Sequence, residues 1–157
     1  MLDLEFQAGI LTMPIFFGTP LQRPENSSFA IDTSLSCLAT SSFRCHNCTH
    51  HYYNERVSKT ARDSQIVQSM RFRAQMLTGD MVTDTVCLDN QSCLNATEFF
   101  EINYDFVSDH DGIFGLAPVD ADEGPPFIKK LKQEGNITEN SATLWLNETA
   151  GILILGG

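Results

Sequence analysis

The sequence predicts an all-β domain with one short helix, and three observations support that prediction. Apolar residues occur in short runs, several of which alternate with polar residues, as in strands with one buried face. Glycine and proline interrupt these runs, as at Gly18-Thr19-Pro20, which is typical of turns between strands. With 157 residues, of which 42% are hydrophobic and 19% charged, the chain has the size and composition of one globular domain.

The expected strands follow one another along the chain. They are residues 6–17, 28–31, two strands within 65–86 that join near residues 74–78, then 98–106, 111–117, 142–146 and 151–155. The segment between residues 34 and 65, which carries cysteines, is expected to be a loop. Pro125-Pro126 predict the start of a helix over residues 127–134, which Gly135 ends.

The charge of the chain excludes some classes of partner. A net charge of −10 argues against nucleic-acid binding, because phosphates repel such a surface unless a basic patch intervenes. The basic clusters, Arg71 with Arg73 and residues 129–132, are expected to be solvated faces. No stretch approaches the length of a membrane span, so neither nucleic acid nor a membrane is an expected partner, and no cofactor is expected.

Glycosylation sequons point to the secretory pathway. Six of the nine asparagines lie in Asn-x-Ser/Thr sequons, where chance gives roughly one or two. These asparagines are Asn26, Asn47, Asn90, Asn95, Asn136 and Asn147. We therefore expect surface glycans and a location that is secreted, lysosomal or otherwise acidic and extracellular. The first residues lack the basic start and apolar run of a signal peptide, so the sequence is expected to be a mature form or an incomplete gene product.

The five cysteines fit an oxidising compartment. Two pairs are close enough in sequence to close small disulfide loops, namely Cys45 with Cys48 and Cys87 with Cys93. Cys37 is left over, either buried or paired outside this segment.

Zinc is the alternative for the first of these pairs, because His50 and His51 follow Cys45 and Cys48. Adjacent histidines point in divergent directions, however, and the spaced second pair of a zinc site is missing. The sequence therefore favours disulfides, and no metal is expected.

An Asp-Thr-Ser turn, Asp32-Thr33-Ser34, follows an apolar strand. Alone it is a weak signal, because aspartate and serine favour ordinary turns. Its meaning comes from the ordered segments around it. These segments are Gly18-Thr19-Pro20, residues 29–34, residues 111–117 and residues 153–157.

In that order, the segments resemble the N-terminal lobe of the pepsin-like aspartic peptidases, the family of pepsin, cathepsin D and renin. The resemblance extends over essentially the whole chain: residues 2–6 resemble the start of a mature enzyme, and residues 77–86 resemble the strand that returns from the flap. It implies that residues 1–157 form a single all-β lobe, a six-stranded type of barrel or sandwich with a short helix. The C-terminal lobe is expected to be absent.

The resemblance also implies the chemistry. Two aspartates, one from each lobe, hold a water; one acts as general base while the other, protonated, donates to the scissile carbonyl. Asp32 is the aspartate that this chain supplies, in a catalytic motif with Thr33 and Ser34, and Thr33 is expected to bond across the lobe interface. Residues 113–115 are expected to pass beneath Asp32 and hold it. The substrate-binding flap is expected to contain Phe72, Arg73, Ala74 and Gln75.

Several positions depart from the family pattern. Leu35 stands where the family has a serine that bonds the catalytic carboxylate, so that carboxylate is expected to lose a donor. Phe72 and Ala39 stand in place of the flap tyrosine and its tryptophan partner. Arg73 and Gln75 replace flap glycines, so closure over a substrate is expected to differ.

The sequence contains no second Asp-Thr-Gly or Asp-Ser-Gly, so the isolated chain is expected not to cleave peptides. Three hypotheses remain open. The chain is one lobe of a secreted endopeptidase that acts on peptides or proteins together with its C-terminal lobe, or it is a catalytically inactive module of the same fold that binds or inhibits. In the third hypothesis, two copies pair around a symmetric site, as in retroviral proteases.

Overall fold

The computed structural model describes residues 1–23, 25–88, 92–118 and 126–157. Its first strands are β1 (Leu2–Gln7), β2 (Ile10–Met13), β3 (Phe16–Phe17), β4 (Phe29–Asp32) and β5 (Leu38–His46), followed by a 3₁₀ turn, η1 (Glu55–Val57). The later elements are β6 (Arg62–Phe72), β7 (Gln75–Cys87), β8 (Cys93–Tyr104), β9 (Gly112–Gly115), α1 (Phe127–Gln133), β10 (Ala142–Leu146) and β11 (Ala150–Leu155). No helix in these ranges is long and apolar enough to cross a membrane.

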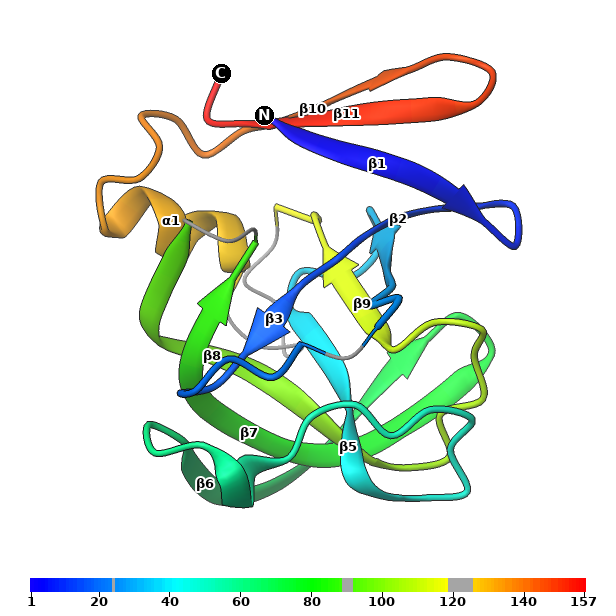
Figure 1. Cartoon of the computed structure of the whole chain (residues 1–157), viewed down its shortest axis with the longest axis vertical. Helices are drawn as coiled ribbons and strands as arrows, with labels where there is room; N and C mark the ends of the chain where they lie inside the picture. Colours follow the sequence, from blue (N-terminus) through cyan, green and yellow to red (C-terminus); the bar gives the residue numbers. More distant parts are fainter. Residues whose placement is uncertain (24, 89–91, 119–125) are drawn as a thin grey trace.

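All of these strands belong to one open sheet (Figure 1). Its order is β10-β11-β1-β2-β4-β9-β5-β8-β7-β3, and β6 pairs with β7 beside this path. The pairs β4–β9 and β5–β8 are parallel, whereas the other pairs are antiparallel. The predicted all-β fold with one short helix is therefore confirmed.

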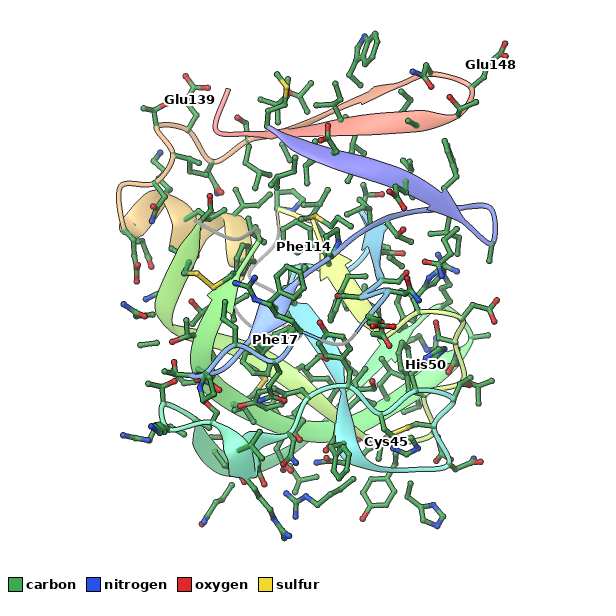
Figure 2. The ribbon with its side chains drawn as sticks, in the orientation of Figure 1. Phe17, Cys45, His50, Phe114, Glu139 and Glu148 are labelled. Atoms are coloured by element: carbon green, nitrogen blue, oxygen red, sulfur yellow. A yellow bond between two sulfur atoms is a disulfide. The ribbon has the colours of Figure 1, made fainter. Side chains whose placement is uncertain are left out.

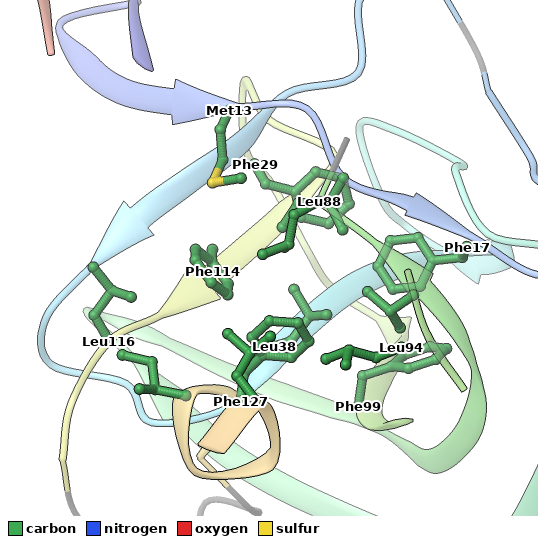
Figure 3. Packing of buried hydrophobic residues seen from close by; sticks show 14 of the residues in the cluster. Met13, Phe17, Phe29, Leu38, Leu88, Leu94, Phe99, Phe114, Leu116 and Phe127 are labelled. Atoms are coloured by element: carbon green, nitrogen blue, oxygen red, sulfur yellow. The ribbon is translucent and has the colours of Figure 1, made fainter. Parts of the chain in front are cut away.

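The larger hydrophobic core lies between the sheet and helix α1 (Figure 3). Phe17 lies near its centre, with ring centroids 5.6 Å from Phe29, 5.6 Å from Tyr53 and 4.8 Å from Phe99. Helix α1 buries Phe127, Ile128 and Leu131 against this core. The helix is too short to be stable alone, so this apolar face is what holds it in place.

A second core lies under the hairpin formed by β6 and β7. It combines residues from the segment after Asp32 with residues from that hairpin and from β8 and β9. Its members are Leu35, Cys37, Ala39, Cys45, Met70, Phe72, Leu77, Met81, Phe100, Ile102, Phe106 and Ile113. The hairpin and the segment after Asp32 are thus packed on the same apolar cluster.

The turn of this hairpin lies earlier than predicted. Phe72 pairs with Gln75, so the turn consists of Arg73 and Ala74, and residues 75–78 belong to β7. Arg73 has φ 53°, a left-handed conformation that tight hairpin turns use and that glycine usually supplies. Because no glycine or asparagine marks the turn, the sequence carried no clear signal for its position. We call residues 72–75 the hairpin tip.

Strand β5 was missed altogether, because its segment was predicted to be a loop. Leu38 and Ala39 are followed by Thr40, Ser41 and Ser42, all of them buried. The strand pairs with β9 on one side and β8 on the other. A central strand that buries small hydroxyl residues lacks the alternation of apolar and polar residues by which strands are recognised.

Candidate active site

Asp32 ends strand β4, and the parallel strand β9 fixes its position. Gly115 of β9 is the backbone partner of Asp32, and the Leu116 N–H donates to the Asp32 carbonyl at 2.8 Å. The Gly115 N–H donates to the Cys37 carbonyl at 3.0 Å. Residues 113–115 therefore lie beside the Asp32 turn, as expected.

Gly115 leaves no room for a side chain at this point. A Cβ placed on Gly115 would collide with the carbonyl oxygens of Leu35 and Cys37. The close approach of β9 to the segment after Asp32 thus depends on the missing Cβ rather than on an unusual φ. This contact ties the strand to the turn that carries the carboxylate.

One oxygen of the Asp32 carboxylate is saturated with donors. Oδ1 accepts the Ser34 N–H at 2.7 Å, the Ser34 hydroxyl at 2.5 Å and the Leu35 N–H at 3.1 Å. The prediction that Leu35 deprives the carboxylate of a hydroxyl donor is thereby corrected, because the neighbouring Ser34 supplies one. The side chain of Leu35 is instead buried in the second core. Thr33 is exposed.

The other oxygen faces the hairpin tip. Arg73 Nη2 lies 3.7 Å from Asp32 Oδ2, and the Arg73 guanidinium lies 5.0 Å from the centre of the Phe72 ring. The Asp32 residue is only 9% exposed, whereas the Arg73 side chain is 51% exposed. The tip predicted to be a flap thus reaches the predicted catalytic carboxylate.

A groove of about 200 Å³ is lined by Arg73, the residue that contacts Asp32, whereas Asp32 itself is not part of the lining. Three of the four predicted flap residues line it, namely Phe72, Arg73 and Gln75, whereas Ala74 is exposed at the turn. The remaining lining residues come from β2, β4, β9 and the segment before β9: Ile10, Ala30, Val107, Ser108, Asp109, His110 and Ile113. The groove therefore runs between the hairpin tip and the two strands that carry and support Asp32.

A polar network that the sequence did not reveal holds the starts of β4 and β9 together. The Ser28 N–H donates to Asp111 Oδ2 at 2.9 Å, and the Ser28 hydroxyl lies 3.1 Å from His110 Nδ1. His50 Nδ1 lies 3.4 Å from Asp111 Oδ1. Burial lowers the pKa of His110 and raises the pKa of Asp111. Both His110 and Ser28 are buried, so we assign this network to positioning the parallel strands.

Both predicted disulfides are present: Cys45 bonds to Cys48, and Cys87 bonds to Cys93. The first closes the loop after β5, near His50 (Figure 2), and excludes zinc bound by these two thiols. Cys37 is buried, with Sγ 3.8 Å from the sulfur of Met70. Among the described residues, no group of three or more His, Cys, Asp and Glu side chains is placed to hold a metal ion.

Five of the six predicted sequon asparagines lie on the surface. Asn26, Asn47, Asn95, Asn136 and Asn147 are exposed. Asn90 lies outside the described residues. The structure thus leaves the five described sites accessible to a glycan, while glycosylation itself stays a prediction.

Comparison with family models identifies the fold. The model for eukaryotic aspartyl proteases matches residues 12–157, which include Asp32, the hairpin tip and all strands from β3 onward. The chain belongs to the eukaryotic aspartyl protease family. This family is pepsin-like and implies peptide substrates; together with the disulfides it is compatible with a secreted or lysosomal location. A search of curated proteins found no match.

Proposed function

We propose that this aspartyl protease chain supplies Asp32 as a catalytic carboxylate of a peptide-cleaving endopeptidase. The observation that carries the proposal is the asymmetry of the carboxylate: Oδ1 is held by three donors, whereas Oδ2 faces the hairpin tip beside the groove. A fixed Oδ1 orients the group, and Oδ2 is then the oxygen available to take a proton from an attacking water.

Peptide hydrolysis by this route needs a second carboxylic acid, because a single carboxylate cannot both accept a proton from water and donate one to the carbonyl. In our proposal residues 1–157 form one lobe, and the second acid comes from a C-terminal lobe or from a second copy of the chain. In the same proposal, the exposed side chain of Thr33 bonds to that partner across the interface. The enzyme acts in an acidic, secreted or lysosomal setting and carries glycans at its sequons.

A peptide-binding module without catalysis is the second candidate. The guanidinium of Arg73 lies beside Oδ2, the oxygen that hydrolysis requires. Arginine keeps its protons, so it cannot replace the missing acid as a proton donor. A two-lobed form that binds peptides in the groove but does not cleave them would establish this candidate.

The test assembles the chain with a C-terminal lobe from its own source that carries an Asp-Thr-Gly or Asp-Ser-Gly motif. The assembled protein is assayed against a denatured protein substrate at acidic pH. We expect cleavage, and we expect Asp32→Asn to lower kcat/KM by about 10²- to 10⁴-fold, because the isosteric amide cannot act as a base.

Asp63→Asn is the matched control, since Asp63 is an exposed carboxylate on β6 away from the groove. It should leave kcat/KM unchanged. Activity that survives Asp32→Asn would overturn the proposal, and so would peptide binding without any cleavage by the assembled wild-type protein.

A further inference from the structure

Two contacts join the hairpin tip to two different parts of the molecule. Arg73 reaches Asp32 at the end of β4, with Nη2 3.7 Å from Oδ2. Gln75 reaches the segment between β8 and β9: its Nε2 donates to the Val107 carbonyl at 3.0 Å, and its Oε1 accepts the Val107 N–H at 3.2 Å. The amide of Gln75 thus pairs with a backbone peptide in the way that a neighbouring strand would.

The residues of the hairpin tip are held together, so the two contacts belong to one structural unit. Phe72 and Gln75 are paired across the turn, and Phe72 is buried in the second core while the Arg73 guanidinium stacks over its ring. Lifting the tip away from Asp32 therefore requires the ion pair and the Gln75–Val107 pairing to break, and it also shifts Phe72 within the second core. The ion pair is weak, because the Arg73 side chain is half exposed and its contact with Asp32 is longer than a hydrogen bond. The two Gln75–Val107 hydrogen bonds lie at the surface, where water competes for the same groups.

We propose that Arg73 and Gln75 form a latch that holds the hairpin closed over Asp32 until a peptide displaces it. The guanidinium occupies the side of the carboxylate that a substrate or a water would approach. It does not release its protons, so it cannot take the place of an acid that donates a proton to the substrate. Arg73, Gln75 and Val107 all line the groove, so a peptide that enters it meets both side chains of the latch. The consequence for catalysis rests on the proposed function of Asp32, whereas the latch is a property of the chain itself.

The latch is testable on the chain alone, without any peptidase assay. A small epoxide esterifies accessible carboxylates, and mass spectrometry of a digest gives the rate at Asp32. We expect Arg73→Ala to raise this rate about two- to fivefold, because the interaction energy of a partly exposed ion pair corresponds to a factor of that size. Gln75→Ala should act in the same direction, and the double variant should raise the rate about tenfold or more. Alanine is chosen because glycine would relax the left-handed turn at residue 73.

Arg71→Ala and Gln68→Ala are the matched controls, because each removes the same side chain from β6 outside the tip. They should leave the Asp32 rate unchanged. Hydrogen exchange of the amides at residues 72–76 gives a second readout, which should quicken in the latch variants alone. Thermal unfolding checks that all variants are folded.

Equal Asp32 labelling and equal exchange in wild type and all three latch variants would overturn the latch and leave the proposed function intact. Conversely, faster labelling in the latch variants supports the latch even where Asp32→Asn fails to affect cleavage. The two failures are therefore distinguishable.

Discussion

Tyr53 and Asp84 form a buried hydrogen bond between the segment after the first disulfide and strand β7. The phenol donates to Asp84 Oδ2 at 2.7 Å, while Oδ1 accepts the Thr60 hydroxyl and the Thr85 N–H. Burial raises the pKa of Tyr53 well above its ordinary value, and the bond to Asp84 adds to the effect. The phenol therefore keeps its proton and remains the donor for Oδ2.

Tyr53→Phe removes this donor and leaves a buried carboxylate oxygen without its partner. We expect the free energy of unfolding to fall by about 2–3 kcal/mol, because an unsatisfied charged acceptor bears the full cost of its lost solvation. Urea unfolding followed by circular dichroism measures the change. Tyr104→Phe, at an exposed tyrosine of β8, should change stability by less than about 0.5 kcal/mol. Equal, small effects at the two tyrosines would contradict the assignment.

At the scale of single residues, the sequence predicted where the main groups lie but not how they are bonded. The resemblance to the pepsin-like peptidases implied that residues 113–115 lie against the Asp32 turn, and the structure places β9 beside it. The sequence did not predict that the Ser34 hydroxyl would bond to the Asp32 carboxylate while the side chain of Leu35 enters the second core. Such a bond depends on which side chain of the turn faces the carboxylate. The ion pair from Arg73 was missed for the same kind of reason, since it joins residues far apart in sequence.

Among the elements, β9 has no room for a side chain at Gly115, because a Cβ there would collide with the segment that follows Asp32. Gly115→Ala should lower the free energy of unfolding by about 3 kcal/mol, at the upper end of overpacking effects, since backbone carbonyls rather than flexible side chains lie in the way. It should also disturb the Asp32 turn, which a changed rate of epoxide labelling at Asp32 would report.

Gly9→Ala is a useful comparison for this prediction. Gly9 has φ 77° but open space around it, so alanine there is strained only through the backbone and should cost about 1 kcal/mol. If Gly115→Ala costs no more than Gly9→Ala in chemical denaturation, the steric account of the β9 contact is wrong.

Elements with a clear signal were the ones predicted from the sequence. Strand β10 and the start of helix α1 were predicted at the residues where the structure places them, because an apolar run and a proline mark them. Strand β5 was not, since its buried Thr40, Ser41 and Ser42 carry no apolar periodicity. Local sequence patterns also did not predict the order of the strands in the sheet. The parallel pairing of β4 with β9, for example, joins segments that lie far apart in the sequence.

For the molecule as a whole, a buried acid on β8, an interior strand of the sheet, links stability to pH. Glu101 is 2% exposed and lies between Thr40 of β5 and Asp80 of β7, and its Oε1 has no hydrogen-bond partner within the described residues. Burial raises the pKa of Glu101 from 4.5 to about 7. A hydrogen bond to Ser42 and the charge of Arg44 oppose the rise, whereas the charges of Glu55 and Asp63 add to it.

The sign of the pH effect follows from proton binding. Between about pH 4.5 and pH 7 the folded chain keeps a proton on Glu101 that the unfolded chain releases. The stabilisation is therefore complete below about pH 4.5 and is lost as the pH rises through 7. A shift of this size corresponds to a loss of about 3 kcal/mol, a large share of the stability of an ordinary domain. The protonation of Glu101 therefore favours folding in the acidic setting that we propose for the chain.

Glu101→Gln should remove this dependence, because the amide keeps the shape and cannot ionise. We expect the variant and the wild type to unfold at similar denaturant concentrations at pH 4.5. At pH 7.5 the variant should be more stable by about 3 kcal/mol. Glu98→Gln, at an exposed glutamate of the same strand, should follow the wild type at both pH values. If the free energy of unfolding changes with pH in the same way in wild type and Glu101→Gln, then groups other than Glu101 cause the pH dependence, since the two proteins differ only at residue 101.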